Sequence, residues 1–355
     1  MADRPKTPPG GSPQEKAKLA DVAKVAGVSL ATASRVLNHP ETVRPAIQGK
    51  VRRAMKLLSY KPDAAGRALA SGRSRVIGAV VPTLGTAIFA DGIESLQNRL
   101  REHGFGLLLA NSQYDPEKEL TEIRLLLERG VDGMALVGDN FSAELLSLVR
   151  QYDVPVVTTY VSRSRHAIPA IGIDNHKGAR EMTRYLIGLG HRDFGIITSH
   201  SPNNDRTTAR YDGILSALAT AGLQCPPGQA VQVQHSVANG RLALRRLMQA
   251  NPAITAIICT TDALALGALS ESRARGLAVP RDLSITGYDD VDIASEYEPA
   301  LTTVHVPAND IGRRAADRLF AMITHEPGQE SDVELEARLM IRASCAPPRR
   351  PLATA

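Results

Sequence analysis

The stretch LADVAKVAGVSLATASRVLN, residues 19–38, constrains the fold of this chain most, because two helical patterns meet there at a very short junction. The first pattern repeats apolar residues three and four positions apart, at Leu19, Val22, Ala23 and Ala26. Gly27 can adopt the positive φ that a sharp helix exit requires. Ser29 is a favourable N-cap for a second helix that begins at once. These residues predict two helices that cross closely, as in a helix-turn-helix.

The second helix has one apolar side, and its other side carries hydroxyl, amide and guanidinium groups. The apolar residues are Ala33, Val36 and Leu37, and the polar ones are Ser29, Thr32, Ser34, Arg35 and Asn38. A third helix over residues 47–58 has a basic side with Lys50, Arg52, Arg53 and Lys56. Such a second helix can enter a DNA major groove, where short hydroxyls suit phosphates and Arg35 can reach a guanine edge. The alternative is a small helical bundle with a basic surface.

The charge of the chain is unevenly distributed. Residues 1–75 contain 15 Lys and Arg against 5 Asp and Glu, a net charge of +10, whereas the whole chain carries +5. The remaining residues are therefore acidic, with a net charge of −5. A basic head on an acidic body indicates that the head binds a polyanion, although a solvated basic surface would have the same composition.

Residues 74–345 alternate between apolar runs and amphipathic helical patterns, which predicts parallel sheets covered by helices. The runs are RVIGAVVP, FGLLLANS, VDGMALVG, VPVVTTY, DFGIITS, ITAIICTT and LSITGYDD. Helices are expected between them, for example over 93–103, 117–129, 177–189 and 263–275. A segment of this length is large for one sheet and natural for two α/β lobes.

Together these motifs resemble the LacI-type (lactose/galactose repressor) family. LADVAKVAGVSLATASRVLN is similar to the first two helices of that family, and the similarity continues through VRRAMKLLSYKPDAAGRALASGRSRVIGAVVP to LMIRASC. The resemblance implies a bacterial transcription regulator that is a homodimer, binds a pseudo-palindromic double-stranded DNA operator and responds to a small molecule. It also implies a bilobed body like that of periplasmic sugar-binding proteins.

The resemblance implies the following division of the chain. Residues 1–16 and 346–355 are expected to be disordered tails, 17–61 a three-helix helix-turn-helix domain, and 62–73 a hinge helix. In the body, 74–174 with 304–325 would form the N-lobe, and 175–303 with 326–345 the C-lobe. The late segment TTVHVPANDIGRRAADRLFAMI would cross back to the N-lobe.

The family's DNA contacts map onto specific residues. Its base-reading positions match Leu30, Ala31 and Arg35, and Leu69 matches the hinge leucine that wedges into the minor groove. Leu30 and Ala31 can offer only apolar contacts, so base discrimination would depend on Arg35. Gly66 would weaken a hinge helix that is already short. The expected DNA-binding residues are Ser29, Leu30, Ala31, Thr32, Ser34, Arg35, Asn38 and Leu69.

Polar and aromatic residues follow the predicted strands, at the edge where ligands bind in open α/β sheets. By resemblance Phe89, Arg210 and Asp289 match recurrent effector contacts, and His235 and Thr261 match less closely. The full expected effector site is Phe89, Tyr160, Arg206, Arg210, His235, Thr261 and Asp289. Each could instead cap a helix or bridge the lobes, and Asp262 is expected to be an N-cap.

The effector is expected to be a carbohydrate. Basic residues outnumber acids at the expected site, where Arg163 and Arg165 join Arg206, Arg210 and His235 against Asp289. This excess favours an anionic sugar derivative, such as a sugar acid or phosphate.

Other function classes find less support. The sequence has no P-loop, GxSxG, HExxH or GxGxxG motif and no metal-ligand spacing, so neither an enzyme nor a cofactor is expected. No apolar run reaches membrane-spanning length and the N-terminus has no signal-like segment, which indicates a cytoplasmic protein. The ending CAPPRRPLATA has no leucine heptad, which favours a dimer over a tetramer. A transport solute-binding protein, or an enzyme acting on a sugar or nucleoside, remains the alternative.

Overall fold

The computed structural model describes residues 17–38, 40–61, 73–199, 203–326 and 332–349. The chain falls into two compact units, which divide between Ser74 and Arg75. The expected hinge at 62–72, including Leu69, and the expected tails at 1–16 and 350–355 lie outside the described residues. Among the helices that are described, none is both long enough and apolar enough to cross a membrane.

In its described residues the first unit contains three α-helices and one short 3-10 helix. They are α1 (Leu19–Ala26), α2 (Leu30–Asn38), η1 (Pro40–Thr42) and α3 (Pro45–Leu57). Gly27 ends α1 with φ of 65°, and the Ser29 Oγ accepts a hydrogen bond from the Thr32 amide at 3.1 Å. Both turn features expected from the sequence are therefore confirmed. Val22, Ala26, Val36, Val51 and Ala54 form the small buried core.

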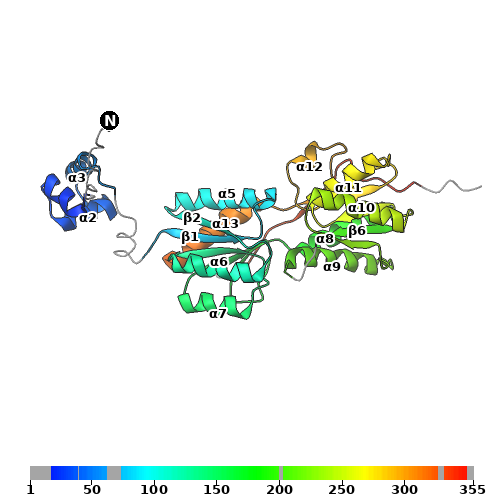
Figure 1. Cartoon of the computed structure of the whole chain (residues 1–355), viewed down its shortest axis with the longest axis horizontal. Coiled ribbons are helices and arrows are strands. Elements are labelled where there is room, and N and C mark those ends of the chain that lie inside the picture. The colour runs from blue at the N-terminus through cyan, green and yellow to red at the C-terminus, as the bar shows by residue number, and fades with distance from the viewer. Residues whose placement is uncertain (1–16, 39, 62–72, 200–202, 327–331, 350–355) are drawn as a thin grey trace, which may run out of the picture. The chain divides into compact units, whose positions relative to one another are not determined.

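The second unit begins with a six-stranded sheet in the order β11-β5-β4-β3-β1-β2, in which all the pairs are parallel. Its strands are β1 (Val76–Val81), β2 (Gly106–Asn111), β3 (Gly133–Val137), β4 (Val156–Thr159), β5 (Ala170–Gly172) and β11 (Val333–Glu334). Helices α5 (Ala87–Glu102) and α13 (Ala308–Thr324) cover one face. Helices α6 (Pro116–Glu128) and α7 (Ala143–Tyr152) cover the other (Figure 1).

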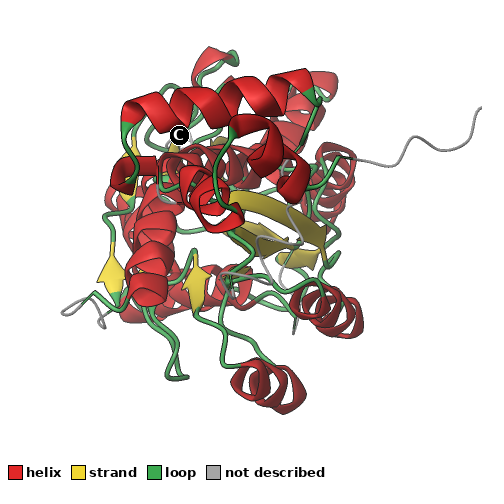
Figure 2. Cartoon of the chain, turned by 90° about the vertical axis from the view of Figure 1, so that its left-hand side faces the viewer, coloured by secondary structure: helices red, strands yellow, loops and turns green. Residues whose placement is uncertain are grey.

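A second parallel sheet has the order β7-β6-β8-β9. Its strands are β6 (Phe194–Thr198), β7 (Ala230–Gln232), β8 (Ala256–Cys259) and β9 (Ser284–Thr286). Helices α8 (Asn175–Gly188) and α9 (Asp205–Thr220) pack on one face, and α10 (Val237–Ala250) and α11 (Asp262–Ala274) on the other. The short α12 (Ile293–Glu296) follows β9. Figure 2 shows strands lying between helices, the layered α/β arrangement that the sequence predicts.

The chain crosses between the two lobes three times. The first crossing leads from β5 into α8, and the second passes through β10 (Thr303–His305) to α13. The third leaves β11, passes through β12 (Arg338–Met340) and returns to the second lobe, where Ser344 donates to the Ile285 carbonyl. Strands β10 and β12 pair with each other in antiparallel fashion.

The observed division differs from the expected one near the C-terminus. Residues 326–345 were expected in the C-lobe, but β11 pairs with β5 in the first sheet. The return to the second lobe therefore follows residue 334. The seven strands predicted from apolar runs are all present. The five other strands of the described residues, β5, β7, β10, β11 and β12, have two or three residues each and lie outside those apolar runs.

Candidate DNA-binding surface and effector site

Helix α2 exposes the residues expected to read DNA. Leu30 is 54% exposed, although it is a large apolar side chain, and Ala31, Arg35 and Asn38 are exposed as well. Ala33 and Val36 on the opposite side are buried, and Val36 packs in the core with residues of α1 and α3. The helix therefore presents apolar residues at its start and a guanidinium one turn later.

The short polar side chains of α2 are engaged with one another. The Ser29 Oγ lies 2.8 Å from the Thr32 Oγ1, and the Asn38 Nδ2 donates to the Ser34 Oγ at 3.3 Å. Arg35, in contrast, makes no hydrogen bond or ion pair with any described residue, and its five N–H donors are available to a ligand.

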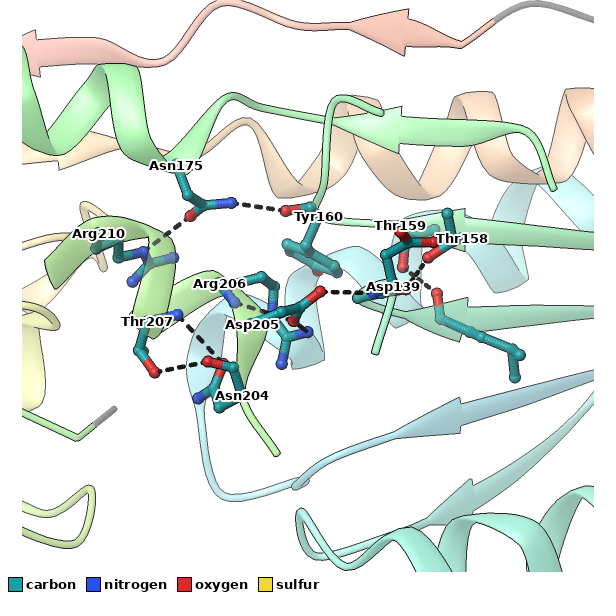
Figure 3. A network of polar contacts seen from close by, with 12 residues as sticks. Asp139, Thr158, Thr159, Tyr160, Asn175, Asn204, Asp205, Arg206, Thr207 and Arg210 are labelled. Atoms are coloured by element: carbon teal, nitrogen blue, oxygen red, sulfur yellow. Dashed lines mark hydrogen bonds and ion pairs between the residues drawn. The ribbon is translucent and has the colours of Figure 1, made fainter. Parts of the chain in front are cut away.

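In the body, the buried guanidinium of Arg210 on α9 joins three segments of the second lobe, and Figure 3 shows its contact with Asn175. Its Nε donates to the Asn175 Oδ1 at 2.9 Å, and its Nη1 donates to the Thr260 carbonyl at 2.8 Å. Nη1 also pairs with the Asp289 Oδ1 at 2.9 Å. The guanidinium carbon lies 3.8 Å from the centroid of the Tyr288 ring, in a cation–π contact.

Two further expected effector residues lie around this pair. Burial raises the pKa of the Asp289 carboxyl, and the positive charge of Arg210 opposes that rise. Burial lowers the pKa of His235, so its imidazole is neutral at pH 7. The Thr261 Oγ1 is buried and finds no hydrogen-bond partner among the described residues. An unsatisfied buried hydroxyl beside a charged pair is what a ligand-binding face leaves open.

Three strand ends place non-glycine residues in the left-handed region, which is strained for L-residues. Tyr160 after β4 has φ of 64°, Asp289 after β9 has φ of 123°, and Gln113 and Tyr114 after β2 have φ of 55° and 59°. The charges of Asp289 and Arg206 act on the pKa of the Tyr160 hydroxyl. The charges of Arg206, Arg210 and Asp289 act on the pKa of the Tyr114 hydroxyl. Tyr160, Asp289 and Tyr114 thus lie in one region between the lobes.

A polar pocket in that region is lined by both lobes. The first lobe contributes residues including Tyr114, Glu119 and Phe141, and the second contributes Asn203, Asp205 and Arg206. Arg206 pairs through its Nη1 with the Oδ1 of the preceding Asp205 at 2.8 Å. The charges of Arg210, one turn further along α9, and of Asp289 also act on Tyr114, so the pocket adjoins the Arg210–Asp289 pair.

The other expected residues take different positions. Phe89 is buried in the first lobe, where its ring meets Tyr160 edge-on at 5.2 Å between centroids. Arg163 is exposed. Arg165 bonds Asp139 through its amide at 2.7 Å and its Nε at 3.3 Å. The basic excess inferred from the sequence is therefore absent, because Arg165, Arg206 and Arg210 each have an aspartate partner.

The expected role of Asp262 was wrong. Thr261 is the N-cap of α11, and Asp262 is its first helical residue. The Asp262 carboxylate faces inward and accepts from the Val291 amide at 2.9 Å and from the Thr303 Oγ1 at 2.5 Å. Burial raises the pKa of Asp262 to about 7, and the nearby Asp289 adds to the rise. Asp262 therefore connects the segment after β9 to α11 by a hydrogen bond.

Several residues at this site were missed from the sequence. They are Tyr114, Glu119, Asp139, Asn175, Asp205 and Tyr288. Tyr288 directly precedes Asp289 in LSITGYDD, and Asp205 directly precedes Arg206, so position next to an expected residue was an available signal. Tyr114 and Glu119 had no such signal, since they join the site only through the meeting of two lobes.

Two family models match the chain: "Bacterial regulatory proteins, lacI family" over residues 18–63, and "Periplasmic binding protein-like domain" over residues 183–345. The HTH-type transcriptional repressor PurR of Haemophilus influenzae (strain PittEE) is 33% identical over 334 residues, covering 92% of this chain and 98% of the relative. The HTH-type transcriptional regulator GntR of Escherichia coli (strain K12) is 33% identical over 308 residues, covering 87% and 92%. The chain belongs to the LacI family of bacterial transcription regulators.

Solved structures agree with this LacI-family assignment. The transcription regulator GntR from Chromobacterium violaceum superposes with a TM-score of 0.72 at 30% identity, covering 76% of this chain and 98% of that one. A CelR–cellobiose complex gives a TM-score of 0.68 at 29% identity, covering 92% and 99%. The lac repressor dimer bound to operator and the anti-inducer ONPF gives a TM-score of 0.84 at 24% identity. The match covers 94% of this chain and 100% of the lac repressor chain, and it shows that the two share a fold.

The buried ion pair makes a prediction for stability. Asp289→Ala should lower the free energy of unfolding by about 3 kcal/mol, because it leaves the Arg210 charge buried without its partner. Adding Arg210→Met should recover part of that loss, so the double-mutant cycle should show a coupling of about 1–2 kcal/mol in urea unfolding followed by circular dichroism.

The exposed pair of Asp310 and Arg313, 2.8 Å apart on α13, is the matched control. Its cycle should give a coupling below about 1 kcal/mol. Strict additivity of Asp289→Ala and Arg210→Met would show that the two side chains do not depend on each other.

Proposed function

We propose that this protein is a LacI-family regulator whose affinity for its operator is set by a small molecule bound between the two lobes. The observation that carries the proposal is the buried Arg210–Asp289 pair beside the unpartnered Thr261 hydroxyl, in a body whose chain also carries a helix-turn-helix. A solute-binding protein for transport has no use for that head. The relatives are transcription regulators, which points away from an enzyme, and a DNA-binding regulator acts in the cytoplasm.

On the DNA side, we assign base discrimination to Arg35, with Leu30 and Ala31 contributing apolar contacts to the major groove. Leu30 is 54% exposed at the start of α2, as a side chain that meets a thymine methyl would be. Ser29, Thr32, Ser34 and Asn38 would hold the phosphates and orient the helix.

Arg35→Ala should lower affinity for the specific operator by about 1–3 kcal/mol, because a guanine contact is lost, while affinity for random DNA changes little. Titration of labelled operator and scrambled duplex at one salt concentration measures both. Lys50→Ala, on the basic side of α3, is the control and should affect the two duplexes equally. An equal loss on both duplexes for Arg35→Ala would show that Arg35 meets only phosphates.

For the effector, we propose a polyhydroxylated carbohydrate or sugar acid. Carboxylates such as Asp289 accept from sugar hydroxyls, and the remaining N–H donors of Arg210 and Arg206 suit hydroxyl or carboxylate oxygens. The aspartate partners of these arginines leave the cleft near neutral. Electrostatics alone therefore does not demand an anion, and the hydroxyl pattern carries the recognition.

A thermal-shift screen tests this class with glucose and ribose, their aldonic acids and their phosphate esters, and adenine as a planar outgroup. At least one sugar compound should raise the melting temperature, because binding stabilises by RT ln(1 + [L]/Kd). The same compound should produce a much smaller rise in Asp289→Ala, whereas Asp310→Ala should respond like the unchanged protein. Stabilisation by adenine with none by any sugar compound would contradict the proposal.

We further propose a homodimer that reads a pseudo-palindromic operator. Strand β2 lies at the edge of the first sheet, and its Leu108 and Leu109 are 37% and 39% exposed. An apolar edge strand of this kind is a pairing surface that monomeric proteins avoid.

Light scattering should therefore give twice the chain mass of 38.0 kDa. Leu109→Lys should shift the protein to a monomer at micromolar concentration, because it places a charge in the contact. Leu125→Lys on α6, where the leucine is 42% exposed, should leave the dimer intact. A dimer unaffected by Leu109→Lys would place the contact elsewhere.

A further inference from the structure

The two lobes touch directly where the start of α9 meets the loop after β3. The Asp205 Oδ2 accepts a hydrogen bond from the main-chain amide of Asp139 at 2.6 Å. Gly138, with φ of 86°, makes this approach possible, because a Cβ there would collide with the Arg206 guanidinium and the Asp205 carboxylate. The contact joins a side chain of the second lobe to the backbone of the first.

Glu119 on α6 lines the pocket beside this contact. It belongs to the first lobe, whereas Asp205 and Arg206, the charged groups that face it across the pocket, belong to the second. Asp115 and Tyr114 line the pocket on Glu119's own side. Among the described residues none forms a hydrogen bond or ion pair with the Glu119 carboxyl, so nothing in its own lobe compensates for its burial.

The protonation of Glu119 therefore depends on the approach of the lobes. Burial raises the pKa of Glu119 from 4.5 to about 7, Arg206 opposes the rise and Asp205 adds to it. Separation of the lobes would rehydrate the carboxyl and remove both α9 groups. Its pKa would then fall back toward the ordinary value.

We propose that the Asp205–Asp139 contact is a latch that holds the lobes together, and that ionisation of Glu119 loosens it. At pH 7 the state with the lobes in contact binds about half a proton more than the separated state. Contact is therefore favoured as the pH falls toward 6, and separation as it rises toward 8. With the two pKa values above, the equilibrium constant for separation rises about tenfold from pH 6 to pH 8.

This inference concerns the cleft proposed above as the effector site, but its test needs no effector, so its failure would leave the proposed function standing. The test is hydrogen exchange of the Asp139 amide in the full-length protein, read at residue level by mass spectrometry with electron-transfer fragmentation. Rates are corrected for intrinsic exchange at each pH. The reference is the Met134 amide, which donates to the Pro155 carbonyl within the first sheet and reports unfolding of that lobe.

Protection of the Asp139 amide should fall about tenfold from pH 6 to pH 8, relative to Met134. In Glu119→Gln, which keeps the shape but cannot ionise, protection should be the same at both pH values. Glu117→Gln makes the same change two residues away at an exposed site and should behave like the unchanged protein. Asp205→Ala should lose protection at both pH values, and Asp205→Asn, which keeps an acceptor oxygen, should retain more of it.

Either of two results would overturn the proposal. One is a pH dependence in Glu119→Gln equal to that of the unchanged protein, which would exclude Glu119 as the titrating group. The other is unchanged Asp139 protection in both Asp205 variants while Met134 shows an intact lobe, which would exclude the latch.

Discussion

The buried guanidinium of Arg210 is the interaction on which the ligand-facing side of the second lobe depends. A buried guanidinium without partners would destabilise the fold by several kcal/mol. The segments that supply its hydrogen-bond acceptors must therefore meet around it. The start of α8 supplies Asn175, the end of β8 supplies the Thr260 carbonyl, and the turn after β9 supplies Asp289. Asn175 then donates to the Tyr160 carbonyl of the first lobe at 2.9 Å, which extends the same network across the lobes.

Several strained residues and one unsatisfied hydroxyl lie at strand ends beside the cleft. Tyr160, Asp289 and Tyr114 adopt positive φ there, and the Thr261 hydroxyl has no partner among the described residues. The cores of the two lobes beneath them are packed with aliphatic side chains. Regular elements hold the strained positions in place, which is how a binding site maintains geometry that no short peptide would adopt.

The sequence predicted those features that local periodicity and turn chemistry control. The Gly27 and Ser29 turn, the amphipathic α2 and the seven strands within apolar runs are of this kind, and resemblance supplied Arg210 and Asp289 as effector-contact positions. It did not predict how charges are compensated in three dimensions. Arg165 appeared to be free for a ligand but bonds Asp139, 26 positions away in the chain. Asp262 appeared to be a helix N-cap, but its buried carboxylate accepts hydrogen bonds from Thr303 and Val291. Glu119 resembles any surface glutamate until the other lobe covers it.

The three crossings between the lobes have a mechanical consequence. Two of them are hydrogen-bonded to each other through β10 and β12, and the third runs from β5 into α8. A single linker would let the lobes twist, slide and swing independently. Several strands that cross together, two of them paired as a ribbon, resist torsion and translation and leave bending as the softest motion. A change in the cleft is thereby passed to the rest of the protein essentially as a change in one quantity, the angle between the two lobes.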